Sequence, residues 1–236
     1  MLTRMPTART ASAPAEQSTA SPAAAPLAAP GVGAARILAG AAIIAVLGYA
    51  YVEGIGHGRS NPFDYFGYFT NLTSLLTAGA LIISGVGALR GLPARPWLVY
   101  ARAAAVACMI VVAVIYNGVV PGTAAAPPWV SATLHAVLPI AVVLDWLLVG
   151  DRRPLAWRSL WVVLPYPLLW LAVALTRGAT DGWVPYGFLL PERGAALLAV
   201  TVLGLLAALL LAAVGVWGGS SVAGVRGALR SRVLQG

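Results

Sequence analysis

Six long apolar stretches, separated by short polar segments, dominate the pattern of hydrophobic and polar positions in this 236-residue chain. A helix that crosses a bilayer needs about 20 predominantly apolar residues, and each stretch is close to that length. None of them alternates between apolar and polar positions as a strand of a membrane barrel would. The pattern predicts an all-α polytopic membrane protein, a bundle of six transmembrane helices at about 34–52, 66–89, 98–119, 129–149, 157–176 and 194–216.

The two ends of the chain differ from this central region. Residues 1–30 are rich in Ala, Pro, Ser and Thr and carry almost no large apolar side chain, so they lack the surface that folding requires. We do not expect a secretory signal, because no apolar core directly follows Arg4 and Arg9. The sequence thus predicts a disordered tail over 1–30, a six-helix domain over 31–218 and a short basic tail over 219–236.

Composition strengthens the membrane prediction. Hydrophobic residues make up 60% of the chain and charged residues only 9%, whereas roughly a quarter of a soluble domain is charged. The formal net charge is +8, and the basic residues are spread between the apolar stretches rather than gathered in one patch. This distribution favours contact with lipid headgroups, so we expect membrane lipids as partners and no nucleic acid.

The basic residues also predict the orientation in the membrane. With six spans, both termini share one side with the loops after the second and fourth spans. Cytoplasmic segments of membrane proteins are enriched in Lys and Arg. The side of the termini holds twelve arginines and the opposite side only Arg59, Arg177 and Arg193, which predicts a plasma-membrane protein with both termini in the cytoplasm; the twelve are Arg4, Arg9, Arg36, Arg90, Arg95, Arg102, Arg152, Arg153, Arg158, Arg226, Arg230 and Arg232.

Few side chains are available to hold a metal ion or a haem. The single cysteine, Cys108, lies inside the third apolar stretch, where a small buried hydrophobe is expected. One of the two histidines, His57, belongs to a polar loop, and the other, His135, lies inside the fourth span. The sequence therefore predicts no metal site and no cofactor.

A polar face on the second span is the first candidate for chemistry, because polar groups inside a membrane are costly. On a helix, Thr70, Thr73, Ser74 and Thr77 fall on one face at i, i+3, i+4 and i+7. Each hydroxyl could simply bond the carbonyl one turn back. Thr70 has a second interpretation, because of the residue that can face it.

That residue is His135, a side chain able to accept or donate a proton near neutral pH. Thr70 lies about four residues into the second span and His135 about six residues into the fourth, and both spans enter from the same side. At about 1.5 Å per residue, both lie roughly 6–9 Å below the interface. The matched depth predicts facing side chains that could act as a nucleophile and its base.

Further polar residues near this depth are candidate hydrogen-bond donors to an oxyanion or a substrate. They are Asn71, Thr73, Ser74, Tyr116 and Asn117, although the last two could simply cap the third span. Asp145 lies about 15 Å farther along the fourth helix than His135 and cannot orient the imidazole. We expect Asp145 instead to form a structural ion pair with Arg102, Arg152 or Arg158.

Four short motifs occur in an order that resembles a known family. They are Asp64–Thr70, Leu134-His135 with Pro139 and Asp145-Trp146, Leu164–Pro167, and Trp183–Leu189. Over about 61–194 they resemble the small actinobacterial six-helix membrane proteins related to the androgen-induced family of intramembrane threonine hydrolases. The resemblance implies hydrolysis of fatty-acid esters, with Thr70 as the catalytic nucleophile and His135 as the base. Bacterial relatives usually carry Ser-Asn three and four residues after the threonine, where this chain has Thr73 and Ser74.

Two functions from different classes agree with these observations. The first is an intramembrane lipid-ester hydrolase that acts on an acyl-ester substrate. The second is a non-enzymatic membrane protein, a small-solute or lipid carrier or a partner subunit, in which the polar face lines a cavity or binds a neighbouring helix. Facing side chains of Thr70 and His135 in a lipid-accessible pocket would favour the enzyme, and diverging side chains would favour the second function.

Overall fold

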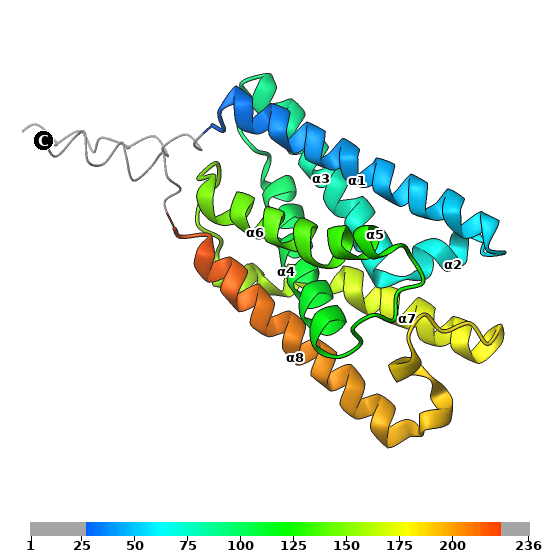
Figure 1. Ribbon diagram of the computed structural model, residues 1–236. Helices are drawn as coiled ribbons and strands as arrows, with labels where there is room; N and C mark the ends of the chain where they lie inside the picture. The colour runs from blue at the N-terminus through cyan, green and yellow to red at the C-terminus, as the bar shows by residue number, and fades with distance from the viewer. Residues whose placement is uncertain (1–26, 223–236) are drawn as a thin grey trace, which may run out of the picture.

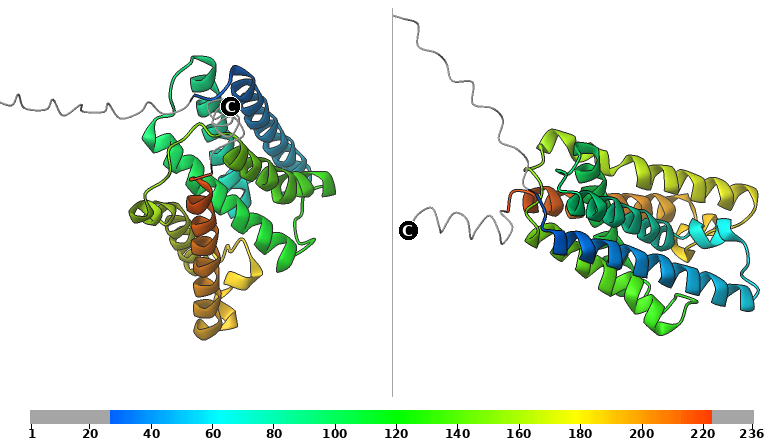
Figure 2. Two further views of the ribbon diagram at one scale, coloured as in Figure 1. Left: turned by 90° about the vertical axis from the view of Figure 1, so that its left-hand side faces the viewer. Right: turned by 90° about the horizontal axis from the view of Figure 1, so that it is seen from above.

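The chain forms a bundle of helices that run along one common direction in a computed structural model, which describes residues 27–222 (Figures 1 and 2). Six helical segments are long and apolar enough to cross a membrane: Pro30–Gly56, Phe69–Leu89, Pro96–Gly118, Pro128–Leu148, Trp157–Thr180 and Ala195–Gly219. The described part is all-α, as predicted, and contains no strand. This architecture is that of a multi-pass membrane protein. Most of the two predicted tails lies outside the described residues.

The helices follow one another with short connections. In chain order they are α1 (Pro30–Gly56), α2 (Pro62–Gly67), α3 (Phe69–Leu89), α4 (Pro96–Gly118), α5 (Pro128–Ala132), the π-helical turn η1 (Thr133–Val137), α6 (Leu138–Leu148), the 3-10 segment η2 (Trp157–Val163), α7 (Pro165–Thr180), the 3-10 turns η3 (Gly187–Leu189) and η4 (Pro191–Arg193), and α8 (Ala195–Gly219). The fourth span therefore combines α5, η1 and α6, and the fifth combines η2 and α7.

The second span begins later than the sequence pattern indicated. Helix α2 is capped by Asn61, whose side chain accepts a hydrogen bond from the Phe63 backbone N–H at 3.0 Å. The chain then becomes extended at Tyr68, with φ −67° and ψ 127°, before α3 begins at Phe69. Trp170 Nε1 donates to the carbonyl oxygen of Gly67 at 2.8 Å and holds this break. Thr70 is consequently the second residue of α3, in the first turn of the helix.

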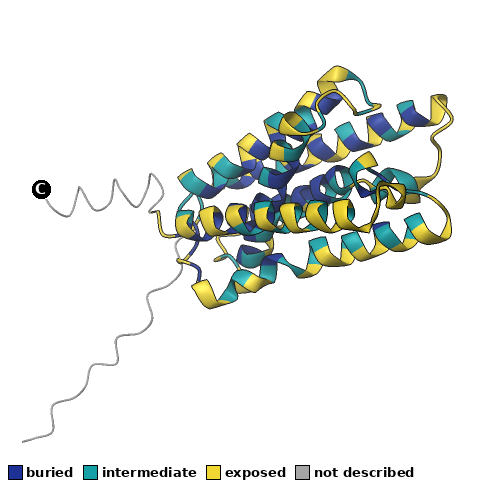
Figure 3. Cartoon of the chain, turned by 90° about the horizontal axis from the view of Figure 1, so that it is seen from below, coloured by how far each residue is buried: buried dark blue, intermediate teal, exposed yellow. Residues whose placement is uncertain are grey.

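Figure 3 shows exposed residues along the outer sides of the helices, and many of them are large and apolar, which suits contact with lipid. Leu38, Leu169 and Leu211 are 70%, 67% and 73% exposed. Apolar side chains of all sizes fill the interior, from Trp146 and Trp217 to Cys108, which is buried as expected. A water-soluble helix would present the opposite distribution, with polar residues outward.

Helices α1 and α3 approach each other closely through glycines. A Cβ atom added at Gly40 would lie 2.7 Å from the carbonyl oxygen of Ala78, and one added at Gly33 would lie 2.8 Å from that of Gly85. Both neighbours are backbone atoms, which cannot turn away as a side chain could. Small residues at such positions let membrane helices pack backbone to backbone.

Gly40→Ala should therefore destabilise the protein, although alanine is the better helix former. Overpacking of this kind costs about 1–3 kcal/mol. The matched control is Gly48→Ala in the same helix, because a Cβ there meets no atom within 4 Å. Thermal unfolding in one detergent should give a lower melting temperature for Gly40→Ala than for Gly48→Ala. Equal melting temperatures would show that α1 can move away from α3 at little cost.

A buried cluster of four charged side chains ties together the end of the bundle opposite Thr70. Arg36 of α1 lies 2.8 Å from Asp145 of α6 and 2.6 Å from Asp151 in the following loop. Arg102 of α4 lies 2.8 Å from Asp145 and 3.0 Å from Asp151. Each arginine thus bridges both carboxylates, and the cluster joins three helices.

Asp145 forms the structural ion pair that the sequence predicted. Arg102 does pair with it, and the second partner is Arg36, rather than Arg152 or Arg158. Arg152 instead donates hydrogen bonds to the carbonyl oxygens of Val149 and Gly219, each at 2.9 Å. Its guanidinium carbon lies 4.0 Å from the centre of the Trp146 ring. The Arg152 side chain therefore contacts Trp146 and the end of α8.

Candidate active site

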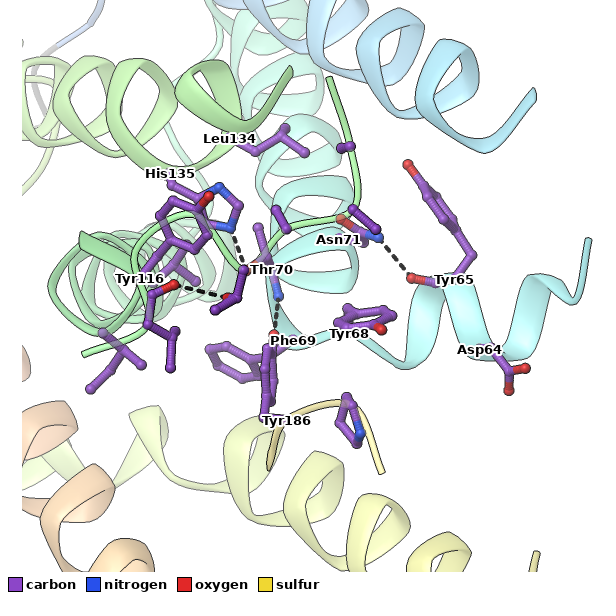
Figure 4. Close-up of a pocket in the computed structure, with 18 of the residues that line it drawn as sticks. Asp64, Tyr65, Tyr68, Phe69, Thr70, Asn71, Tyr116, Leu134, His135 and Tyr186 are labelled. Carbon is purple, nitrogen blue, oxygen red and sulfur yellow. Dashed lines mark hydrogen bonds between the residues drawn. The ribbon is translucent and has the colours of Figure 1, made fainter. Parts of the chain in front are cut away.

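Thr70 and His135 face each other inside the bundle (Figure 4). Thr70 Oγ1 lies 3.3 Å from His135 Nε2, and each residue is only 8% exposed. Thr70 comes from the first turn of α3, and His135 comes from the π turn of the fourth span. The structure thus brings together the two residues that the depth estimate placed at one level.

The hydrogen bond of the second ring nitrogen of His135, Nδ1, indicates which nitrogen carries the proton. Nδ1 is 2.8 Å from the carbonyl oxygen of Ser131, and a carbonyl oxygen can only accept a hydrogen bond. A neutral imidazole oriented in this way carries its proton on Nδ1 and has a free electron pair on Nε2. The Thr70 hydroxyl then donates to Nε2, which is the arrangement required for a base to remove the hydroxyl proton. The Ser131 carbonyl, rather than a carboxylate, orients the ring.

The π turn that presents His135 has an identifiable cause. Pro139 has no backbone N–H, so it cannot donate to the carbonyl oxygen of His135 four residues earlier. The Asn117 side chain of α4 donates to that oxygen instead, at 3.1 Å. In η1 the Leu138 N–H donates to the Thr133 carbonyl, five residues back. Such π turns are common at functional sites.

Tyr116 holds the imidazole plane in position. Its ring stacks on that of His135, with centroids 3.6 Å apart and an angle of 16° between the planes. Ser131 Oγ donates a hydrogen bond to the Tyr116 hydroxyl oxygen at 2.7 Å. The α4 residues Tyr116 and Asn117 therefore support His135 from its ring face and from its backbone.

The remaining polar residues of α3 do not join this pair. The Asn71 amide donates to the carbonyl oxygen of Tyr65 at 2.8 Å and points away from His135 (Figure 4). Thr73 Oγ1 lies 2.8 Å from the Tyr166 hydroxyl, and Thr77 donates to the Thr73 carbonyl at 2.7 Å. Ser74 Oγ is buried and has no partner among residues 27–222. Only Thr70 of this polar face contacts the imidazole.

One residue at the site was not selected from the sequence. The Tyr186 hydroxyl accepts a hydrogen bond from the Thr70 backbone N–H at 3.4 Å. Tyr186 lies in the connection between α7 and α8, and its ring stacks on Phe188 with centroids 5.1 Å apart. Burial raises the pKa of Tyr186 above its ordinary value, so its hydroxyl keeps its proton. The aromatic segment Trp183–Leu189 was the only signal for it in the sequence.

Ion pairs and aromatic contacts hold that connection against the start of α3. Arg177 of α7 lies 2.8 Å from both Asp64 and Asp181. Its guanidinium carbon lies 4.2 Å from the centre of the Trp183 ring. Trp183 in turn packs on Gly67, where an added Cβ would clash with the indole ring. These contacts place Tyr186 beside Thr70.

A large cavity of about 1010 Å³ contains the pair, and we call it the site cavity. Thr70, His135 and Tyr186 all line it. Its lining includes polar side chains between the end of α1 and α2, and apolar side chains of α7 and α8. The polar ones are Glu53, Arg59, Asn61 and Asp64, and the apolar ones are Leu168, Leu171, Val202, Leu205, Leu206 and Leu209. Within residues 27–222, His, Cys, Asp and Glu form no group of three that could hold a metal ion.

The fold and the site together define the class of protein. It is a six-span helical membrane protein with a buried threonine–histidine pair in a cavity lined by polar and apolar side chains. Comparison with models of known protein families, with curated proteins and with solved structures finds no match to this chain. The geometry of the pair is therefore the observation from which its function has to be inferred.

Proposed function

We propose that the protein is an intramembrane hydrolase of lipid esters, with Thr70 as nucleophile and His135 as base. The distance of 3.3 Å between Thr70 Oγ1 and His135 Nε2, inside the site cavity, carries the proposal. A threonine hydroxyl is a weak nucleophile and requires an adjacent base. The bond from Nδ1 to the Ser131 carbonyl supplies that base in the required tautomer. The resemblance of the short motifs to intramembrane threonine hydrolases supports the same assignment.

The reaction proceeds in two acyl-transfer steps. In the first, Thr70 Oγ1 attacks the ester carbonyl carbon while its proton passes to His135 Nε2. The tetrahedral intermediate collapses, the bond to the alcohol oxygen breaks, and His135 returns the proton to that oxygen. In the second, a water molecule loses a proton to His135 Nε2 and attacks the carbonyl carbon of the Thr70 ester. The tetrahedral intermediate collapses, the bond to Thr70 Oγ1 breaks, His135 returns the proton to Oγ1, and the carboxylic acid leaves.

The lining of the site cavity supports a lipid as substrate. Its apolar part lies between α7 and α8, whose outer surfaces carry exposed leucines. Burial of acyl chains against such side chains lowers their free energy relative to exposure to water. The polar side chains that also line the cavity suit a water supply for the second step. A lipid carrier would need this cavity as well, but it would not need the Thr70–His135 pair.

A hydroxyl-reactive alkyl fluorophosphonate tests the assignment directly. The purified protein should be labelled at one site, and peptide mass spectrometry should place the label on Thr70. Thr70→Ala should abolish labelling, whereas Thr77→Ala should be labelled as the wild type, because Thr77 bonds the Thr73 carbonyl and does not line the cavity. Wild-type protein that is neither labelled nor able to hydrolyse an acyl ester would favour the carrier.

We further propose that the protein lies in the plasma membrane with both termini in the cytoplasm. The excess of arginines on the side of the termini supports this orientation, and both ends of the described chain lie at the same end of the bundle (Figure 1). A reporter that is active only outside the cytoplasm should be inactive when fused after Gly236 and active when inserted near Asp181. The reverse pattern would overturn the orientation.

A further inference from the structure

The proposed reaction needs hydrogen-bond donors to the oxyanion, and the two amides predicted from the sequence do not provide them. When Thr70 attacks, the carbonyl oxygen of the ester becomes negatively charged and requires donors at about 2.7–3.1 Å. Asn71 was the nearest amide candidate, but its side chain is bonded to the Tyr65 carbonyl. Asn117 is bonded to the carbonyls of Ala113 and His135. Neither amide is directed at the Thr70 hydroxyl.

The backbone of the nucleophile itself provides one donor. Thr70 is the second residue of α3, and the first N–H groups of a helix have no carbonyl partner within it. The positive end of the helix dipole lies at the same place and favours a nearby negative charge. In the structure this N–H donates to the Tyr186 hydroxyl, which shows that an oxygen atom can occupy the position in front of it.

Tyr186 provides a second donor at the same point. Its hydroxyl oxygen accepts the Thr70 N–H, so its own proton is directed elsewhere and can be donated. The ring is fixed on several sides, with centroids 5.7 Å from Tyr68, 6.0 Å from Trp170 and 5.1 Å from Phe188. Tyr186 lines the site cavity together with Thr70 and His135, so a bound ester can reach it.

We propose that Tyr186 is a third catalytic residue, whose hydroxyl and the Thr70 backbone N–H together bind the oxyanion. The inference depends on the proposed hydrolase and adds the group that its intermediate needs. During attack, the carbonyl π electrons move to the oxygen, which accepts hydrogen bonds from both donors. On collapse the electrons return, the alcohol leaves with the proton from His135, and Tyr186 keeps its own proton throughout.

Tyr186→Phe removes this donor and retains the ring. With a p-nitrophenyl acyl ester, kcat should fall about 100-fold or more while KM changes little, because the bond forms only in the transition state. A long-chain alkyl boronic acid, which forms a negatively charged tetrahedral adduct with a nucleophilic hydroxyl, should bind correspondingly more weakly. 3-Fluorotyrosine at 186, which keeps the hydroxyl, should retain kcat within a few-fold. The matched control is Tyr49→Phe, which removes the hydroxyl of an exposed side chain of α1 that does not line the cavity.

The outcomes separate this inference from the proposed function. If Thr70→Ala and His135→Ala are inactive but Tyr186→Phe has the wild-type kcat, Tyr186 is not a catalytic residue and the hydrolase stands. If Tyr186→Phe raises KM and leaves kcat unchanged, or if its lower activity disappears when rates are expressed per folded molecule, Tyr186 only shapes the cavity. Wild-type protein without turnover that depends on Thr70 overturns both proposals.

Discussion

Thr70→Ala should abolish hydrolysis of an acyl ester, and His135→Ala should lower kcat by about 10²–10⁴-fold. The first variant has no nucleophilic oxygen, and the second has no group to take the proton from Thr70 Oγ1, which lies 3.3 Å from Nε2. Turnover of a p-nitrophenyl acyl ester by detergent-solubilised protein, at matched concentrations of folded protein, measures both effects.

The double variant provides the sharper part of this test. A nucleophile and its base act as a unit, so Thr70→Ala with His135→Ala should be no less active than Thr70→Ala alone. Thr77→Ala serves as the control, since its hydroxyl is bonded within α3. Activity that survives in both single variants would exclude this mechanism. Additive losses would show that the two residues contribute to separate steps.

Asp151→Asn should produce the largest loss of stability in the chain. The substitution leaves Arg36 and Arg102 buried, each 3% exposed, with Asp145 as their remaining carboxylate. Removing one partner from a buried charge cluster costs about 3–5 kcal/mol. Arg36→Gln combined with Asp151→Asn restores the balance of charge, so the pair should lose less than the sum of the two single losses. Thermal unfolding in detergent measures all three variants.

The control for this effect is an exposed ion pair of the same type. Asp181 pairs with Arg177 at 2.8 Å, but Asp181 is exposed, so Asp181→Asn should leave the melting temperature nearly unchanged.

The buried cluster also predicts a pH dependence of stability. Burial of Asp151 is outweighed by the charges of Arg102 and Arg36, which hold its pKa below the ordinary value. Its stabilisation is therefore fully present above pH about 4 and is lost as the pH falls through the lowered pKa.

The apolar pattern predicted the class of fold, because span length and polarity are properties of each segment alone. The proximity of Thr70 and His135 could also be predicted from the sequence, because two helices that enter from one side carry residues to comparable depths. The depth estimate began the second span at residue 66, however, whereas the break at Tyr68 starts α3 at Phe69. A local sequence with Pro62 and Gly67 indicates such a break but does not specify its angle.

The remainder of the site depends on contacts between segments far apart in the chain. Tyr186 follows Thr70 by 116 residues, and the ion pairs of Arg177 and the packing of Trp183 on Gly67 bring it there. Likewise, Arg36 reaches Asp145 across 109 residues, a pairing that no local pattern could select over Arg152. Helix propensity and hydropathy do not determine which faces of separate helices pack together.

The π turn at Thr133–Val137 has a consequence for how this span can change in evolution. A five-residue hydrogen-bonded loop holds one residue more than an α turn, and each α-helical residue rotates the chain by about 100°. Loss of a single residue there would shorten this loop to an α turn and would rotate the segment before it, with Trp129 and Ser131, relative to Asp145. A homologue that gains or loses this one residue would keep the charge cluster, but different side chains of the segment before the turn would then face the imidazole.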